Sequence, residues 1–257
     1  MGKFERIEVG RRIVDIFLPD DRAKGPRPLL LMHDGHNAFF PEHSSFGGVW
    51  RADEAVESLR IRGPKPVVAA VWHLPGKRET EYVPQDVVQR NPGIKAKPLP
   101  GVDLAQLRGN AYVRTLADKV IPAVSELADI RTDPAGVGLV GASAGAWISL
   151  YAMAKRPDAF GTAMCLSMPW FWATNGFIEG FVDLLPGPSR GNRIWHDHGT
   201  ADYDRGYGPA HVRADARLQR AGWAWPQAVS NTYIGHGHNE GAWAARLPEV
   251  LQWWLNG

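Results

Sequence analysis

The sequence is poor in cysteine: one, Cys165, occurs in 257 residues. A single thiol excludes the internal disulfide framework by which many small secreted domains are stabilised. Cys165 lies in the apolar segment TAMCLSM, and free cysteine is among the most buried residue types. We therefore predict a buried structural thiol.

Long hydrophobic runs and runs of one charge are also missing. No apolar stretch approaches the roughly 20 residues of a membrane-spanning helix, and the N-terminal MGKFERIEV lacks the apolar core of a secretory signal. We expect a cytoplasmic protein without membrane contact. Lys and Arg number 29 against 27 Asp and Glu and are scattered along the chain, which argues against a nucleic-acid partner. Internal repeats and low-complexity tracts are absent too, which favours one domain over residues 1–257.

The apolar residues fall into short segments of strand length with helical patterns between them. The sequence predicts strands at residues 4–9, 12–18, 28–32, 67–72, 137–140, 163–167, 193–196 and 228–234, the first two as an antiparallel hairpin. It predicts helices at 112–129, at 144–154 and near the C-terminus. Their core-facing stripes comprise Leu116, Val120, Ile121, Val124 and Leu127 in the first, and Trp243, Leu247, Val250, Leu251 and Trp254 in the last. Alternation of strands and helices along the chain is typical of an α/β protein whose mostly parallel sheet has helices on both faces.

Two connections are long, at residues 74–103 and 168–192. Structureless connections beyond roughly 12 to 15 residues are uncommon in compact domains and often border a binding site. We expect both segments to lie beside the functional site.

The segment GASAG around Ser143 matches the Gly-x-Ser-x-Gly pattern of a nucleophile elbow. In that turn the serine backbone is strained, and small neighbours avoid a collision across it. A predicted buried strand ends directly before the motif and a predicted helix starts directly after it, which is the frame that the motif requires. We therefore predict that Ser143 is a nucleophile, against the alternative that it only caps a helix.

A serine nucleophile needs a histidine base and usually an acid that orients the base. The loop between the last strand and the last helix carries two candidate bases, His236 and His238, which spacing does not separate. Asp202 and Asp204 follow an earlier predicted strand and are the candidate acids, although each could instead be a helix N-cap. We favour Asp202, three residues beyond a glycine that ends the strand.

A tetrahedral intermediate also needs donors for its oxyanion. The backbone N–H after the nucleophile belongs to Ala144, and a second donor comes from the loop after the third strand. In that loop Gly35 permits a tight bend, so the N–H of His36 is the predicted second donor.

These motifs together resemble the esterase D, or putative esterase, family of α/β-hydrolases. The resemblance is carried by LMHDGHN, GVWRADEA, RETEYVP, GASAG, HGTADYD and GHNEGAW, in the family's order over nearly the whole chain from about residue 4. It implies the α/β-hydrolase fold and ester hydrolysis through an acyl-enzyme. It also implies Ser143 as nucleophile, His238 as base and His36 as oxyanion donor, and it leaves Asp202 and Asp204 both open as the acid. The family's usual Ser-Met-Gly-Gly is Ser-Ala-Gly-Ala here, with Ala146 in place of the second glycine.

The expected ligand is a small-molecule ester, with no cofactor and no metal. Trp50, Trp170, Phe171 and Trp172 are predicted to line the pocket, which suits a bulky or aromatic ester. For Trp170, Phe171 and Trp172, packing in the core is an equal alternative. Arg51, Lys77 and Arg78 could receive an anionic group of the substrate, but we favour their interpretation as solvated surface charges. Two other functions remain open. Three close pairs, His33/His36, His196/His198 and His236/His238, could serve a metal-dependent hydrolase, and a protein of this fold could bind a ligand without turnover.

Overall fold

The computed structural model describes residues 2–45, 47–91, 93, 102–171, 175–188 and 191–256. Eight strands form one sheet in the order β1-β2-β4-β3-β5-β6-β7-β8. β1 pairs antiparallel with β2, and β2 pairs antiparallel with β4. From β4 to β8 all neighbours are parallel. The predicted α/β fold, with a mostly parallel sheet and an antiparallel first hairpin, is confirmed.

All eight predicted strands are present, with ends that shift by up to three residues. They are β1 (Lys3–Val9), β2 (Arg12–Leu18), β3 (Leu29–His33), β4 (Val67–Val71), β5 (Val137–Ala142), β6 (Thr162–Leu166), β7 (Arg193–Gly199) and β8 (Ala228–Tyr233). Every residue of β3, β4, β5 and β6 is buried. Short unbroken apolar runs of this kind are expected where helices cover both faces of a parallel sheet.

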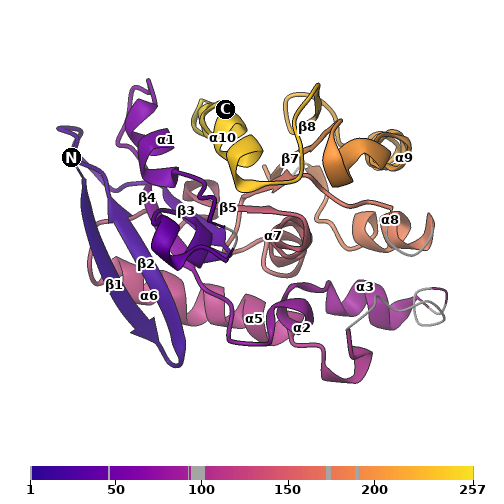
Figure 1. The fold of residues 1–257 in the computed structure, drawn as a ribbon, viewed down its shortest axis with the longest axis horizontal. Helices are drawn as coiled ribbons and strands as arrows, with labels where there is room; N and C mark the ends of the chain where they lie inside the picture. The colour runs from indigo at the N-terminus through magenta and orange to yellow at the C-terminus, as the bar shows by residue number, and fades with distance from the viewer. Residues whose placement is uncertain are drawn as a thin grey trace.

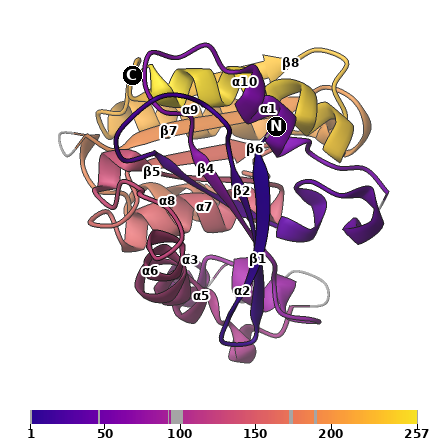
Figure 2. The ribbon, with the colours of Figure 1, turned by 90° about the vertical axis from the view of Figure 1, so that its left-hand side faces the viewer.

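Side chains of the central strands alternate between two hydrophobic layers. In β3, Leu29 and Leu31 join the layer that contains α7 (Ala144–Lys155), α8 (Asn175–Val182) and α9 (Gly208–Arg220). Leu30 and Met32 join the other layer, with α1 (Ala52–Ser58) and α10 (Glu240–Leu255). Figures 1 and 2 show α1 and α10 on one face of the sheet and α7 on the other. Period-two alternation of strand side chains places apolar residues on both faces at once.

The predicted helix at residues 112–129 begins and ends earlier than expected. It comprises α5 (Gly109–Thr115), the π-helical turn η4 (Leu116–Val120) and α6 (Ile121–Ser125). Pro122 has no N–H to donate to the hydrogen bonds of the helix. The wider π-helical turn lies directly before it. Four residues of the predicted stripe are buried, but Leu127 is 45% exposed because it lies beyond the helix end, so its assignment to the core is wrong.

The two connections expected to be loops contain helices. Residues 74–103 include α2 (Arg78–Tyr82) and α3 (Gln85–Arg90), and residues 168–192 include α8. Short 3₁₀ turns complete the described elements: η1 (Gly35–Asn37), η2 (Pro41–His43), η3 (Leu104–Gln106), η5 (Pro134–Gly136) and η7 (Asp202–Gly206). Trp172 and most of residues 92–101 lie outside the described residues.

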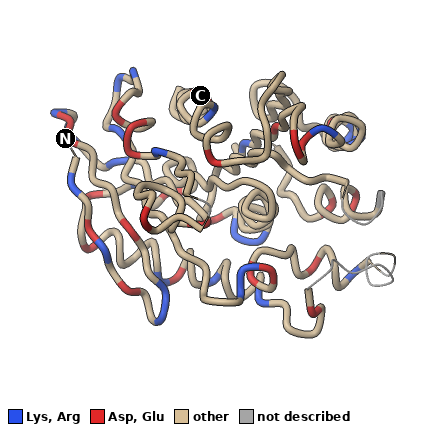
Figure 3. The backbone as a smooth tube through the Cα atoms, in the orientation of Figure 1, with Lys and Arg blue, Asp and Glu red and all other residues tan. Residues whose placement is uncertain are grey.

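Parallel pairing brings the carboxyl ends of β3 to β8 to one edge of the sheet, where chemistry is expected in open α/β folds. Charged residues of both signs are distributed over the chain (Figure 3). Cys165 is fully buried, as predicted, and burial raises the pKa of its thiol. Within the described parts of the chain, no helix combines the length and apolarity that a membrane crossing requires.

Candidate active site

Ser143 occupies a strained turn between β5 and α7. Its backbone has φ 57° and ψ −125°, a conformation that is costly for a residue with a Cβ and that persists only where the surrounding structure enforces it. Its N–H donates to the Leu166 carbonyl oxygen at 3.1 Å, which ties the turn to the end of β6. The strand, turn and helix around Ser143 are those that the sequence predicts for a nucleophile elbow.

The two glycines of the motif have different importance. A Cβ on Gly141 would lie 2.6 Å from the carbonyl atoms of Gly145, which is closer than Cβ atoms approach backbone. A Cβ on Gly145 would lie 3.5 Å from the Cβ of His33, an ordinary contact distance. The first glycine is therefore required by the turn, whereas the second position has room for a methyl group.

His238 pairs with Asp204. Its Nδ1 lies 2.6 Å from Asp204 Oδ1. The other carboxylate oxygen, Oδ2, accepts hydrogen bonds from the Ser167 hydroxyl at 2.6 Å and the Gly199 N–H at 2.7 Å. Burial opposes ionisation of Asp204, but the bonds from His238, Ser167 and Gly199 outweigh it and lower the pKa of the carboxyl. An ionised carboxylate on Nδ1 places the imidazole proton there and leaves the lone pair on Nε2.

The preference for Asp202 is corrected by this geometry. Asp202 is exposed, whereas the Asp204 side chain is fully buried against the imidazole. The physical reason is the path of the chain after β7. The N–H groups of Thr200 and Ala201 both donate to the His236 carbonyl oxygen, and only the following 3₁₀ turn, η7, brings a carboxylate back beneath the ring of His238.

The second candidate base, His236, lies elsewhere. Its ring packs against Tyr233, with the ring centroids 5.4 Å apart, and it does not line the cavity that contains Ser143. Its carbonyl oxygen holds the chain after β7 instead.

The sequence did not predict a buried polar network that contacts Asp204. The Ser167 hydroxyl accepts bonds from Trp243 Nε1 at 2.9 Å and Arg246 Nη2 at 3.1 Å. Arg246 Nη1 donates to Asp197 Oδ1 at 2.7 Å, and neither of these charged side chains is exposed. Ser167 has a positive φ of 44° directly after β6. An arginine within the apolar stripe of the last helix is the sequence signal that could have revealed this network.

The predicted oxyanion donors lie at two tight turns. Ala144 is the first residue of α7, and N–H groups in the first helical turn have no acceptor within the helix. His36 lies in η1, which follows Asp34 in the left-handed conformation (φ 52°). A Cβ on Gly35 would lie 2.4 Å from the Ala70 carbonyl, so this close approach to β4 requires glycine. Burial lowers the pKa of the His36 imidazole.

Ser143, His36 and His238 line one cavity of about 560 Å³. It is lined by Asp34, His36, Asn37, Ser45, Trp50, His73, Arg78, Glu79, Ala142, Ser143, Tyr203, His238, Asn239, Glu240 and Trp243. Trp50 stacks on Trp243 with the ring centroids 5.4 Å apart, so one of the predicted pocket aromatics is in place.

The other predicted pocket aromatics are not among the lining residues. Trp170 is fully buried, and its Nε1 donates to His196 Nδ1 at 3.1 Å, so it belongs to the core. Phe171 is 51% exposed and packs on Tyr207, and neither residue lines the cavity. Trp172 lies outside the described residues. Of the long connections, 74–103 contributes Arg78 and Glu79 to the lining, and 168–192 contributes no described residue.

Arg78 is more than a surface charge. Its Nε and Nη2 each donate to one oxygen of Asp34, both at 2.7 Å. Burial raises the pKa of Asp34, but the adjacent guanidinium dominates and lowers it. The pair therefore stays ionised on the wall of the cavity.

Residues that could hold a metal differ from the predicted histidine pairs. Among the described residues, one group of His, Cys, Asp or Glu has its ligand atoms close enough together: Asp34, His36 and His73. Histidines of the predicted pairs contact other side chains instead. Nδ1 of His33 lies 2.9 Å from the Tyr112 hydroxyl, and Nε2 of His196 lies 3.1 Å from Asp215 Oδ1.

Comparison with known proteins identifies the family of this chain. A model of the family described as "Putative esterase" matches residues 8–254. The uncharacterized protein YbbA of Bacillus subtilis strain 168 is 22% identical over 191 residues, which cover 74% of this chain and 69% of YbbA.

Several solved structures share the fold. An IroE-like serine hydrolase from Shewanella oneidensis has a TM-score of 0.70 at 13% identity, covering 100% of this chain and 80% of that one. The enterobactin esterase FES from Shigella flexneri, solved in the presence of enterobactin, has a TM-score of 0.64 at 18% identity, covering 98% and 59%. A ferulic acid esterase has a TM-score of 0.66 at 14% identity, covering 100% and 98%. With a family match over almost its whole length, the chain belongs to the putative esterase family of α/β-hydrolases and is a carboxylesterase-type hydrolase.

Proposed function

We propose that the chain hydrolyses carboxylic esters through an acyl-enzyme, with Ser143 as nucleophile, His238 as base and Asp204 as the orienting acid. The observation that carries the proposal is the strained turn at Ser143, which lies in the same cavity as an imidazole whose other nitrogen is bound by a buried carboxylate. Strain at a single serine between a strand and a helix is costly and is retained where it serves a reaction.

In the proposed reaction, Ser143 Oγ attacks the ester carbonyl carbon while His238 Nε2 takes the hydroxyl proton. The resulting imidazolium is stabilised by Asp204, and the N–H groups of Ala144 and His36 bind the oxyanion. When the tetrahedral intermediate collapses, the C–O bond breaks and the imidazolium proton goes to the leaving alkoxide. Water then attacks the acyl-enzyme by the same sequence, and the acid is released with regeneration of the Ser143 hydroxyl.

The cavity favours a bulky or aromatic ester. Its volume of about 560 Å³ is within the range typical of small-molecule sites, and the stacked Trp50 and Trp243 form an apolar wall. Aromatic rings pack well in offset or edge-on contact with such a wall. Two structural relatives support this substrate class by their names, one a ferulic acid esterase and the other an enterobactin esterase also solved with 2,3-di-hydroxy-N-benzoyl-serine.

The test is turnover of p-nitrophenyl, feruloyl and catecholate-lactone esters by the wild-type protein and by Ser143→Ala. We expect the variant to lose activity by about 10³-fold or more. Ser149→Ala is the matched control, because Ser149 lies on the same helix with its hydroxyl bound to the Gly145 carbonyl oxygen at 2.8 Å. A Ser143→Ala protein that turns over every ester at the wild-type rate would refute the proposal.

The two alternative functions would give different results in ester-turnover assays. A metal-dependent hydrolase would lose activity in a chelator and resist a serine-directed fluorophosphonate. A non-catalytic binding protein would bind the ester without releasing product in any of the assays.

A further inference from the structure

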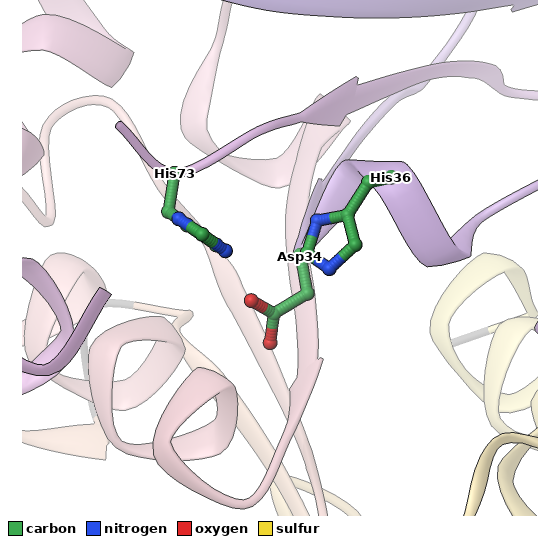
Figure 4. Close-up of side chains that lie close together, drawn as sticks. All are labelled: Asp34, His36 and His73. Atoms are coloured by element: carbon green, nitrogen blue, oxygen red, sulfur yellow. The ribbon is translucent and has the colours of Figure 1, made fainter. Parts of the chain in front are cut away.

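Three side chains converge on the cavity wall without a hydrogen bond between them among the described contacts. One ligand atom from each of Asp34, His36 and His73 lies within 4.8 Å of the others. Figure 4 shows the Asp34 carboxylate near both imidazole rings, with its side chain between them in this view. The arrangement follows from the sheet, because β3 and β4 are parallel neighbours and the residues just after each strand meet at the same edge.

One ring nitrogen of His73 has a lone pair available to bind a metal ion. Its Nδ1 lies 3.0 Å from the Leu74 carbonyl oxygen. A carbonyl oxygen only accepts hydrogen bonds, so Nδ1 carries the proton and Nε2 carries the lone pair. A backbone carbonyl on one imidazole nitrogen is the usual way in which a metal-binding histidine is oriented through its other nitrogen.

The spacing is close to that around a single ion. Nitrogen and oxygen ligands bind Zn²⁺ at roughly 2.0 to 2.2 Å, so ligand atoms of one ion stand at most about 4 Å apart. The three ligand atoms already lie within 4.8 Å of one another, so small rotations of the side chains would close the site. Two imidazoles and one carboxylate also leave a coordination position open, as in zinc sites that take an exogenous ligand.

Arg78 determines which ions can bind. Its guanidinium already donates to both oxygens of Asp34, and each oxygen keeps a second lone pair. Outer hydrogen bonds to a ligating carboxylate are common in metal sites, but the positive charge repels a cation and disfavours ions held mainly by oxygen. The imidazole ligands therefore favour Zn²⁺, Cu²⁺ or Co²⁺ over Mg²⁺ and Ca²⁺.

We propose that Asp34, His36 and His73 bind one transition-metal dication of the zinc type, and that the bound ion inhibits the esterase. The ion would occupy the cavity that Ser143 and His238 line, beside the His36 turn that supplies the proposed oxyanion donor. The inhibitory consequence rests on the proposed function, whereas the binding of the ion does not.

The test measures binding and activity separately. Chelator-treated protein is titrated with Zn²⁺ by calorimetry and with Co²⁺ by visible absorption. We expect one ion per chain, with affinity reduced at least about tenfold by His73→Gln and again by His36→Gln as a second variant. His43→Gln is the control, because His43 is another histidine near Trp72 but is not in the group of three. Mg²⁺ at the same concentration should give no binding signal.

Two outcomes would overturn the proposal. The first is wild-type Zn²⁺ affinity in both His73→Gln and His36→Gln. The second is binding that His238→Gln abolishes while His73→Gln retains it, because the ion would then be held by the catalytic base. Should the protein prove inactive on every ester, the calorimetric comparison still decides whether the metal site exists. Where activity is measured, Zn²⁺ should inhibit the wild-type enzyme at lower concentration than His73→Gln.

Discussion

The Ser167 hydroxyl donates a 2.6 Å hydrogen bond to Oδ2 of Asp204, the carboxylate that holds His238. The same hydroxyl accepts bonds from Trp243 and Arg246 of α10. A single buried oxygen thus connects the acid of the proposed triad to the last helix. It lies one strand away from the proposed nucleophile, since Ser167 follows β6 as Ser143 follows β5.

Ser167→Ala should weaken both the fold and the reaction. The substitution removes one donor to Asp204 and leaves two buried donors, Trp243 Nε1 and Arg246 Nη2, without this acceptor, which costs about 1 to 3 kcal/mol in free energy of unfolding. We expect kcat to fall several-fold, because Asp204 is less firmly held. Urea unfolding and ester turnover measure the two effects. Ser230→Ala, which removes an exposed hydroxyl bound to Asp215, should change neither.

Asp204→Asn and Asp202→Asn should differ strongly in activity. An amide at residue 204 cannot fix the Nδ1–H form of His238 as a carboxylate does, so we expect kcat to fall by about 10³- to 10⁴-fold. Asp202 is exposed, and its substitution should leave kcat within about twofold of wild type. Equal losses in the two variants, or a larger loss at 202, would contradict the assignment of the acid.

Alanine should have opposite effects at the two glycines of the elbow. At Gly141 the new Cβ would meet the Gly145 carbonyl at 2.6 Å, so Gly141→Ala should lower Tm or prevent folding. At Gly145, inside the first turn of α7, the space is sufficient, and alanine favours a helix by up to about 1 kcal/mol over glycine. Calorimetric Tm values should therefore rank Gly145→Ala at or above wild type and Gly141→Ala well below it.

The contribution of Asp204 to stability should depend on pH. Its pKa is lower in the folded protein than the ordinary value of 3.8, so the stabilisation is complete above 3.8 and is lost as pH falls through the lowered folded value. The difference in free energy of unfolding between wild type and Asp204→Asn should accordingly be larger at pH 7 than at pH 3. A difference that grows as the solution is acidified would show that the carboxylate is not held in its ionised form.

The sequence predicted the sheet well because its central strands are short, apolar and bounded by polar turns. Val67–Val71 illustrates this, since every residue is buried and no helical period competes. The strained turn at Ser143 was also predictable, because the residues that form it are the immediate neighbours of Ser143. Local motifs carry the information for such features.

Features that depend on the path of the chain beyond a strand could not be predicted in the same way. The choice between Asp202 and Asp204 depends on hydrogen bonds to the His236 carbonyl, more than thirty residues away in the sequence. Trp170 and Trp50 are both aromatic residues on predicted loops, yet one is a core residue and the other lines the cavity. His73 joins Asp34 only because two strands are neighbours in the sheet.

The most direct measurement is mass spectrometry of the protein after reaction with a fluorophosphonate, followed by peptide mapping. We predict one adduct per chain, located on Ser143, which forms rapidly in the wild-type protein and is slowed in Asp204→Asn in proportion to its loss of activity. An unmodified Ser143 peptide from a preparation that hydrolyses esters would contradict this prediction.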